Sequence, residues 1–569
     1  MSFKRLTLLL LATSLASGCS SLLPNNDGQA AAASPMDSEE VMMATGDEDF
    51  KASVAAGSDN NSRTDARLDD AISPELQARA KDARTKLDEP VAQEKSTGAN
   101  DDLWQRLRSG FALDHSVDNG RVQAQLDWYT SHPRYINRVV DRGSRYLYYI
   151  LEQAEERDLP TEFALLPIVE SAFDPFAYSH GRAAGLWQFI PSTAKYFGLT
   201  ESWWHDDRRD VIKATNAAFT YLERLTNRFD GNYMLALASY NAGGGTISSA
   251  MRQNRNAGKS TDFWSLALPR ETRHYVPKLI ALAKIFDNPE AYNIELPSLK
   301  NQPYFEVVKT GSQLDLAQAA RLAEVDINEI YLLNPSYNRW ATTPEGPHRL
   351  LVPKKNADTF REALARFPKE QRVSWQDYRV KAGDNLGAIA LKFSTTPSVI
   401  KQANNLDSDL IRIGQQLLIP SATKDSDAYA LSQPQRLKRT QNRERDGTKV
   451  QYTVRSGDTF WEIARDHDVS VRQVAAWNGM APGDPLIPGK ELVIWSQTTD
   501  RTIANRASSR DNMVRRVGYR VRSGDSLHAI ANKFAVNVRD IASWNDLNTD
   551  RYLQPGQSLV LYVDVRNSP

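Results

Sequence analysis

The sequence predicts a multidomain α+β protein in which a mainly helical domain is followed by small βααβ modules. Residues 101–295 are dense in aromatic side chains and carry apolar residues at helical spacing. Beyond residue 376 the chain repeats one pattern three times, which indicates an array of small modules. Its 569 residues also exceed what one ordinary core holds, so about four domains are expected.

Composition excludes several classes of protein. With 41% hydrophobic and 25% charged residues, the chain cannot be wholly disordered. Seventy basic residues balance seventy acidic ones, which argues against nucleic acid as a partner. Cys19 is the sole cysteine, so neither an internal disulfide nor a thiolate metal cluster can form. The eight histidines lack ligand spacing and no calcium loop occurs, so we expect no metal and no cofactor.

Residues 1–19 read as an export signal. Two basic residues precede a short apolar stretch, and small residues then lead to Cys19. One interpretation is an ordinary signal peptide cut near Ala16, with Cys19 incidental. The run 15–20 resembles the lipobox of bacterial lipoproteins, although Ala16 stands where Leu is commoner. This resemblance implies an acylated Cys19 that inserts into lipid. Because Ser20 rather than Asp follows, it further implies sorting to the outer membrane, with the body of the protein facing the periplasm.

Residues 20–100 predict a flexible tether. Apart from Phe50 this segment contains no aromatic residue, so it cannot bury enough apolar surface to offset the entropy of ordering. The domain at 101–295 follows, and its helical patterns span 135–154, 160–171, 211–229 and 275–286.

Three segments, at 376–421, 450–496 and 517–563, share one pattern. Each begins with a short Tyr-containing strand and a Gly-Asp pair, then carries Ile-Ala, an Asn twenty residues after the Asp, and a Gly before a closing apolar strand. The pairs are Gly383 and Asp384, Gly457 and Asp458, and Gly524 and Asp525. This spacing predicts a strand, a Gly-Asp turn that caps a helix, a second helix and a return strand.

The repeats resemble LysM modules, which implies binding to glycans that contain N-acetylglucosamine. Alternatively, they merely space or stabilise their neighbours. A fourth, degenerate copy at 300–356 begins near Tyr304, where Gly311 precedes Ser312 instead of Asp, and Asn334 takes the place of the later Asn. The polar segments 422–449 and 497–514 are interpreted as solvated spacers.

Within the helical domain, Glu170 ends an apolar run that starts at Phe163. Desolvation there would raise the pKa of its carboxyl, as the general acid of a glycosidase requires. Alternatively, backbone groups cap Glu170, or it pairs with Arg182. From these residues alone, the catalytic interpretation is not the favoured one.

Three more runs, at 185–194, 239–245 and 271–277, offer the amide, hydroxyl and aromatic groups that sugar-binding sites use. With Glu170 and in this order, they resemble the four motifs of the family 1 lytic transglycosylases, whose domain is lysozyme-like, of the goose type (SLT). The resemblance implies that Glu170 is the single acid and base, and that substrate contacts come from Ser179, Gln188, Tyr240, Asn241 and Tyr275. Trp187 and Ile190 depart from the methionines common in the family, which should alter subsite shape.

Hydrolysis of a glycoside ordinarily uses two carboxylates, and the second candidate, Asp174, precedes a proline and fits a turn better. The resemblance implies instead that the C6 hydroxyl attacks within the substrate. Cleavage between N-acetylmuramic acid and N-acetylglucosamine would then leave a 1,6-anhydro ring. Alternatives are a lysozyme-like hydrolytic muramidase and a non-catalytic scaffold that binds peptidoglycan. In each case the partners are peptidoglycan glycan strands and, through acylated Cys19, outer-membrane lipid.

Overall fold

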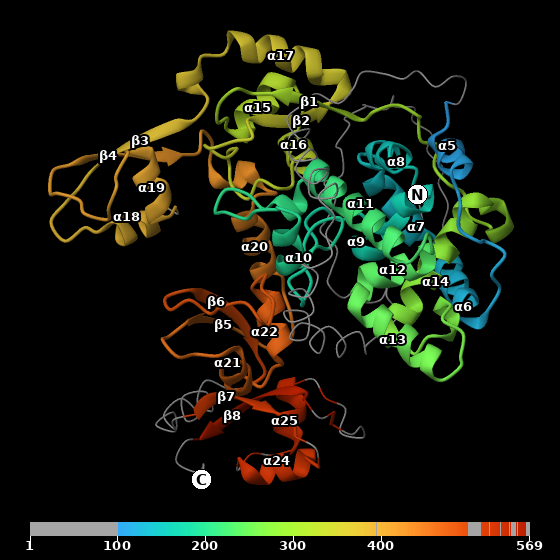
Figure 1. The fold of residues 1–569 in the computed structure, drawn as a ribbon. Helices are drawn as coiled ribbons and strands as arrows, with labels where there is room; N and C mark the ends of the chain where they lie inside the picture. Colours follow the sequence, from blue (N-terminus) through green and yellow to red (C-terminus); the bar gives the residue numbers. More distant parts are fainter. Residues whose placement is uncertain are drawn as a thin grey trace, which may run out of the picture. The chain divides into compact units, whose positions relative to one another are not determined.

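A computed structural model (Figure 1) describes residues 101–564, apart from 394, 499–513, 523, 535, 537, 546, 548–552 and 555. The predicted signal, the acylated Cys19 and the tether lie outside the described residues. Among those described, no helix combines the length and the apolar character needed to cross a membrane.

The first described domain is helical. Asn119, Asp210 and Asn232 cap three of its helices by accepting hydrogen bonds from backbone N–H groups of the first turn. The helical pattern over 135–154 forms two helices, and residues 144–146 separate them. The α-helices are α5 (Leu103–Ser109), α6 (Gly120–Ser131), α7 (Pro133–Gly143), α8 (Leu147–Glu155), α9 (Leu166–Ser171), α10 (Pro191–Tyr196), α11 (Val211–Arg228), α12 (Tyr233–Ala242), α13 (Gly244–Asn256) and α14 (Arg270–Asp287). Short 3₁₀ turns are η3 (Thr161–Leu165), η4 (Asp207–Arg209), η5 (Phe263–Ser265) and η6 (Pro289–Tyr292).

Helix α14 lies at the centre of this domain and contacts α5, α6, α9 and α12 (Figure 1). Eleven of its residues are buried, although its first turn is polar. The buried aliphatic and aromatic side chains of α14 and its neighbours form one large apolar cluster. This cluster holds α9 and the start of α14 in fixed positions, and both carry predicted site residues.

Four modules follow, each a two-stranded antiparallel sheet with two helices between its strands. This arrangement confirms the predicted βααβ order. The elements of the first are β1 (Phe305–Lys309), α15 (Leu316–Ala323), α16 (Ile327–Leu333) and β2 (Arg349–Pro353), then η7 (Lys354–Asn356), α17 (Ala357–Arg366) and η8 (Lys369–Gln371). Those of the other three are β3 (Ser374–Arg379), α18 (Leu386–Lys392), α19 (Pro397–Ala403), β4 (Gln416–Ser421); β5 (Thr448–Thr453), α21 (Phe460–Asp466), α22 (Val471–Trp477), β6 (Glu491–Ser496); and β7 (Val514–Arg520), α24 (Leu527–Lys533), α25 (Val538–Asn545), β8 (Ser558–Asp564).

The Gly-Asp pair does not cap the first helix of a module, so that prediction was wrong. Asp458 accepts hydrogen bonds from the Tyr452 hydroxyl and from the backbone N–H of Arg455, both over 2.7 Å, and thereby closes the turn. Thr459, the next residue, caps α21. Gly457 has a φ of 91°, which a glycine adopts without strain. Asp384 and Asp525 make the same two contacts.

The Asn of each repeat ties the second helix to the return strand. In the middle repeat, the amide of Asn478 donates to the carbonyls of Val474 and Val493 and accepts from the N–H of Val493, each over 2.8 Å. The other two repeats and the degenerate first module use Asn404, Asn545 and Asn334 in the same way.

The segment 422–449 is not simply a solvated spacer, which corrects the prediction. It contains η9 (Ser426–Tyr429) and α20 (Gln433–Asn442). Tyr429 is buried, and its hydroxyl donates to Asp315 over 2.8 Å. Leu431 joins the apolar core of the first module. This part of the segment therefore completes the core of the first module.

Candidate active site

Glu170 lies near the end of α9, where the chain leaves the helix by an abrupt turn. Ala172 and Phe173 both have positive φ values, 50° and 55°. The Ser171 hydroxyl, fully buried, donates to the carbonyl of Leu186 over 3.0 Å and so joins the end of α9 to the 185–190 run. The hydrogen bond of Ser171 thus holds two of the predicted motifs together beside Glu170.

The carboxyl of Glu170 is partly buried, and its surroundings favour the protonated form. Burial raises the pKa of Glu170 to about 8, and the negative charge of Glu271 adds to this effect. A 2.5 Å hydrogen bond from the Tyr275 hydroxyl to Oε1 and the positive charge of Lys278 act in the opposite direction. Glu170 is therefore mostly protonated at neutral pH.

Two tyrosines, the partly buried Tyr240 and the buried Tyr275, lie beside this carboxyl. The hydroxyl of Tyr240, on α12, donates to the carbonyl of Trp187 over 2.9 Å, so α12 is joined to the run that carries Gln188. Burial, reinforced by the charge of Glu170, holds the pKa values of Tyr240 and Tyr275 well above 10. Both side chains therefore remain neutral hydroxyl donors across the physiological pH range.

Gln188 adopts a φ of 48°, and its side-chain amide donates to the carbonyl of Gly185 over 2.8 Å. Ser179 lies in a tight loop, where its Oγ accepts from the N–H of Ala183 over 3.0 Å. Residues 179–188, termed here the 179–188 loop, therefore present two of the predicted substrate-binding side chains on one short, internally bonded segment.

Asn241 is held by a carboxylate that sequence reasoning missed. Its amide donates to Glu271 Oε1 over 3.0 Å and its carbonyl accepts from the Thr272 hydroxyl over 2.8 Å. Glu271 is the first residue of the last motif. A glutamate in the first turn of a helix is usually explained by its favourable interaction with the helix dipole, so its position in the sequence did not indicate a role in the site. Only the fold shows that this charge acts on Glu170.

Arg182, the alternative side-chain partner of Glu170, and Asp174, the candidate second carboxylate, both make other contacts. Arg182 lies 2.7 Å from Asp484. Asp174 Oδ1 accepts from the N–H of Phe176 over 2.9 Å, which confirms it as a turn residue. Within the described part of the chain, no three His, Cys, Asp or Glu side chains are grouped as a metal site would require.

Comparison with known proteins agrees with this geometry. Residues 148–263 match the transglycosylase SLT domain, 304–369 match the LysM-like domain of lytic transglycosylase MltD, and 378–420, 452–495 and 519–561 match the LysM domain. Membrane-bound lytic murein transglycosylase D of Escherichia coli K12 is 34% identical over 475 residues, which cover 83% of this chain and 88% of that protein. The chain belongs to the MltD family. This membership confirms the predicted helical lysozyme-like domain with LysM modules and the predicted enzyme class, a peptidoglycan lytic transglycosylase.

Other relatives match parts of the chain. A putative tributyltin chloride resistance protein of Alteromonas is 35% identical over 186 residues, which cover 33% of this chain and 88% of that one. An autolysin of Enterococcus faecalis is 30% identical over 186 residues, covering 32% and 24% of the two chains. The solved structure of an inactive variant of the lytic transglycosylase Slt from Pseudomonas aeruginosa is 25% identical, covers 26% of this chain and 24% of that one, and has a TM-score of 0.20. Membership of the MltD family associates the protein with the cell envelope, and its LysM modules identify peptidoglycan as its partner.

Proposed function

We propose that this member of the MltD family cleaves the β-1,4 bond between N-acetylmuramic acid and N-acetylglucosamine and leaves 1,6-anhydro-N-acetylmuramic acid ends. One observation carries the proposal. Glu170 is a partly buried carboxyl with a pKa raised to about 8, and it receives a hydrogen bond from Tyr275. Such a group supplies a proton at neutral pH and then holds the resulting negative charge.

The reaction needs one protein carboxyl. Glu170 gives its proton to the glycosidic oxygen as the bond from that oxygen to C1 breaks, and the 2-acetamido group of the muramic acid assists. The Glu170 carboxylate then takes the proton of the C6 hydroxyl, whose oxygen bonds to C1. No water is consumed, and Glu170 ends protonated as it began. Attack within one sugar has a high effective molarity, so no second carboxylate is required to activate a nucleophile.

The other nearby carboxylates already have hydrogen-bonding partners. Asp174 accepts from a backbone N–H, and Glu271 accepts from Asn241. Neither arrangement resembles a general base that orients a water molecule, and this supports transglycosylation over hydrolysis.

Substrate contacts are assigned to five side chains. Ser179 and Gln188 on the 179–188 loop and Tyr240 would contact the sugars directly. Tyr275 and Asn241 would contact the sugars and also orient the groups around the reacting bond. Tyr275 does so through its hydrogen bond to Glu170, and Asn241 through its hydrogen bond to Glu271.

We also propose that acylated Cys19 anchors the protein in the outer membrane, with residues 20–100 as a tether in the periplasm. The lipobox-like run and the serine after Cys19 support this placement. The LysM modules would then hold glycan strands near the catalytic domain and raise the local substrate concentration.

Mass spectrometry of muropeptides tests the reaction. Purified sacculi would be incubated with the soluble protein that lacks its first 19 residues, and in parallel with the Glu170→Gln variant. We expect products one water lighter than hydrolytic products from the first protein and none from the variant, which should still bind sacculi. Reducing ends would show a hydrolase, and unchanged turnover by Glu170→Gln would overturn the assignment of the acid.

A further inference from the structure

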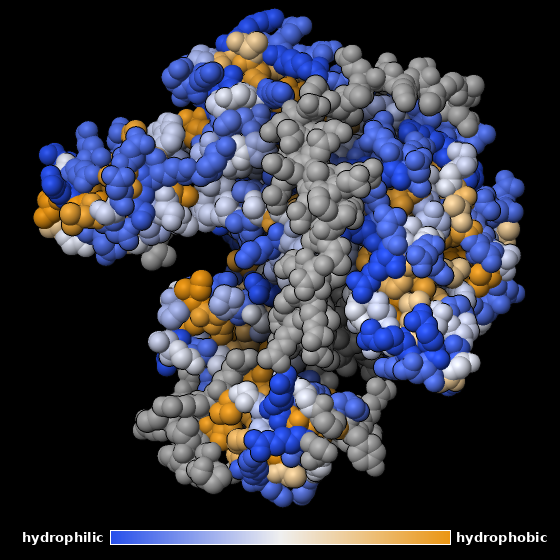
Figure 2. All heavy atoms as spheres, viewed as in Figure 1, coloured by the Kyte–Doolittle hydropathy of each residue, from blue (hydrophilic) through white to orange (hydrophobic). Residues whose placement is uncertain are grey.

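The LysM-like module, residues 304–369, differs from the first two LysM modules in one loop. In the first two LysM modules the loop from the repeated Asn to the return strand exposes apolar side chains: Leu410 and Ile413 are 75% exposed and Ile487 is 62% exposed. Figure 2 shows hydrophobic side chains on the surface of the module that contains β3 and β4. The corresponding loop of the LysM-like module, residues 334–349, is largely buried, with Tyr337 5% and Thr342 0% exposed.

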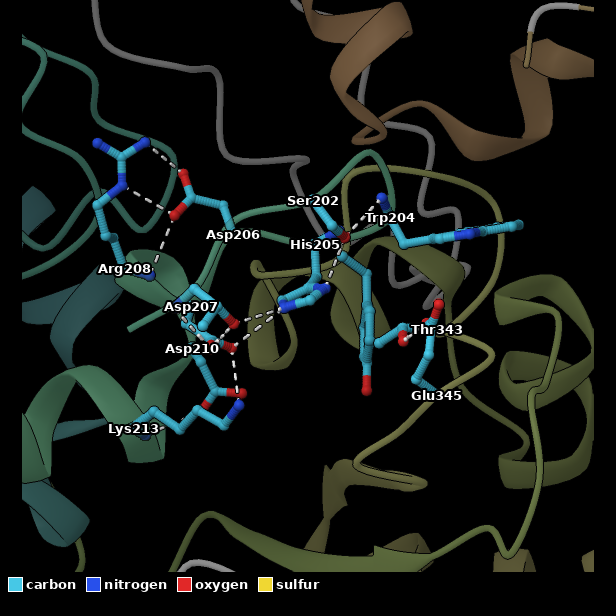
Figure 3. A network of polar contacts seen from close by, with 12 residues as sticks. Ser202, Trp204, His205, Asp206, Asp207, Arg208, Asp210, Lys213, Thr343 and Glu345 are labelled. Carbon is cyan, nitrogen blue, oxygen red and sulfur yellow. Dashed lines mark hydrogen bonds and ion pairs between the residues drawn. The ribbon is translucent and has the colours of Figure 1, made fainter. Parts of the chain in front are cut away.

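A segment of the transglycosylase domain, residues 202–210, covers this loop. The N–H of Asp206 donates to the carbonyl of Ser336 over 2.9 Å, and the N–H of Asn338 donates to the carbonyl of Trp204 over 2.8 Å. The rings of Trp204 and Trp340 meet edge to face at 5.2 Å. Figure 3 shows Trp204, on the 202–210 segment, together with Thr343 and Glu345 of the covered loop. Backbone pairing and ring packing therefore occupy this surface.

A buried ion pair fixes the end of the same segment. Arg349, at the start of β2, lies 3.0 Å from Asp210, the residue that caps α11. Burial alone would raise the pKa of Asp210, but the positive charges of Arg349 and Lys213 hold it below its usual range. Removal of one member would leave the other buried without its charge partner, so the pair makes the position of the segment depend on the module.

The 202–210 segment in turn supports the 179–188 loop. The guanidinium of Arg208, paired with Asp206 over 2.8 Å, donates to the carbonyl of Arg182 over 2.8 Å (Figure 3 shows the Arg208–Asp206 pair). The backbone carbonyl of Arg208 approaches Gly185 so closely that a Cβ there would lie 2.2 Å from it. Any shift of the segment must therefore move the loop that carries Ser179 and Gln188.

We propose that the LysM-like module does not bind glycan through this surface but positions the 179–188 loop by holding the 202–210 segment, with Arg349 as a positioning residue. The module has the LysM fold, yet the loop that exposes apolar side chains in the first two LysM modules is here covered by the enzyme's own chain. Only the kinetic test of this inference rests on the proposed function, because the proposed function assigns substrate contact to Ser179 and Gln188.

Arg349→Gln tests the proposal in the soluble protein, with Glu329→Gln as the matched control. Glu329 also joins the module to the catalytic domain, through a 3.0 Å pair with Arg145, but it does not contact the 202–210 segment. On short soluble glycan strands, we expect Arg349→Gln to raise KM about tenfold with kcat within about twofold, because the loop binds substrate whereas Glu170 is held by α9. Arg349→Lys should recover most of the loss, and Glu329→Gln should leave both constants near those of the parent.

Binding to sacculi gives a second, independent measurement. In a Glu170→Gln background, Arg349→Gln should leave sacculus affinity within about twofold, since the three LysM modules carry that affinity. A larger loss would show that the module itself binds glycan and would overturn the proposal. Equal effects of Arg349→Gln and Glu329→Gln on KM and kcat would also overturn it, because both would then be merely structural. If Arg349→Gln does not fold, Asn338→Ala, which loses the contact to Arg209, takes its place, and an unchanged KM in Asn338→Ala would overturn the proposal. Failure of the parent to form anhydro ends would refute the proposed function alone.

Discussion

Tyr275 donates a 2.5 Å hydrogen bond to Oε1 of Glu170, and the same helix carries Glu271, whose negative charge acts on Glu170 in the opposite direction. The bond favours the ionised carboxyl, whereas burial and Glu271 favour the protonated one. A single residue that serves first as acid and then as base needs both influences. A pKa of about 8 leaves Glu170 protonated at neutral pH, yet its ionised form keeps a hydrogen-bond donor in place.

Tyr275→Phe should move the alkaline limb of the pH profile of kcat/KM, where activity falls as Glu170 loses its proton, to higher pH. Removal of a donor to the ionised form raises the pKa of Glu170 further, so the acid stays protonated over a wider range. The check is kcat/KM for short soluble glycans measured from pH 5 to 10, because this ratio reports groups in the free enzyme. The plateau should also fall by about ten- to a hundredfold, since the base loses its hydrogen bond. A limb that stays in place would contradict the role given to this bond.

Glu271→Gln should move the same limb in the other direction. Loss of a negative charge lowers the pKa of Glu170, so activity should fall at lower pH than in the parent. The Gln carbonyl can still accept from the Asn241 amide, so the orientation of Asn241 is kept. Glu271→Ala removes both charge and acceptor, and it should lower activity more at every pH. A limb unmoved by Glu271→Gln would show that this charge does not reach Glu170.

Glu170→Gln should stabilise the fold increasingly as pH rises. The folded pKa of about 8 lies above the ordinary value of 4.5, so the stability linked to the proton is complete below about pH 4.5 and is lost as pH rises toward 8. Glutamine has no such loss. Allowing for partial exposure, the variant should gain about 2 kcal/mol between pH 5 and pH 8. Thermal melts followed by far-UV circular dichroism at both pH values measure this, and a pH-independent difference would contradict it.

The helical domain and the repeats could be predicted because local patterns determine them. Apolar residues at helical spacing and the Gly-Asp and Asn positions were sufficient for the order of elements. The role of Asp458 was mistaken because an aspartate before a helix fits a cap equally well, and only the position of Tyr452 shows that it closes the turn instead.

Long-range contacts could not be predicted. Glu271 and Glu170 are distant in sequence, and nothing local indicates that one charge acts on the other. The burial of residues 334–349 against 202–210 depends on hydrogen bonds between two backbone segments that are more than a hundred residues apart in the sequence. The polar composition of 422–449 likewise gave no sign that Tyr429 is buried, because its hydrogen-bond partner, Asp315, lies 114 positions away in the sequence.

The contact of Tyr429 with Asp315 decides where the chain can be shortened. A chain that ends near residue 370 loses Tyr429 and Leu431, and it leaves the buried Asp315 without its hydroxyl donor. Burial of two such side chains contributes about 4 kcal/mol, so this chain should melt well below the parent. A chain that ends after Asn442 keeps both and retains one LysM module. We expect it to bind sacculi more weakly than the parent, because the LysM matches at 452–495 and 519–561 are gone. Equal melting temperatures for the two truncations would show that the 422–442 segment does not stabilise the first module. Equal sacculus affinity in the longer truncation and in the parent would show that the last two modules do not add to binding.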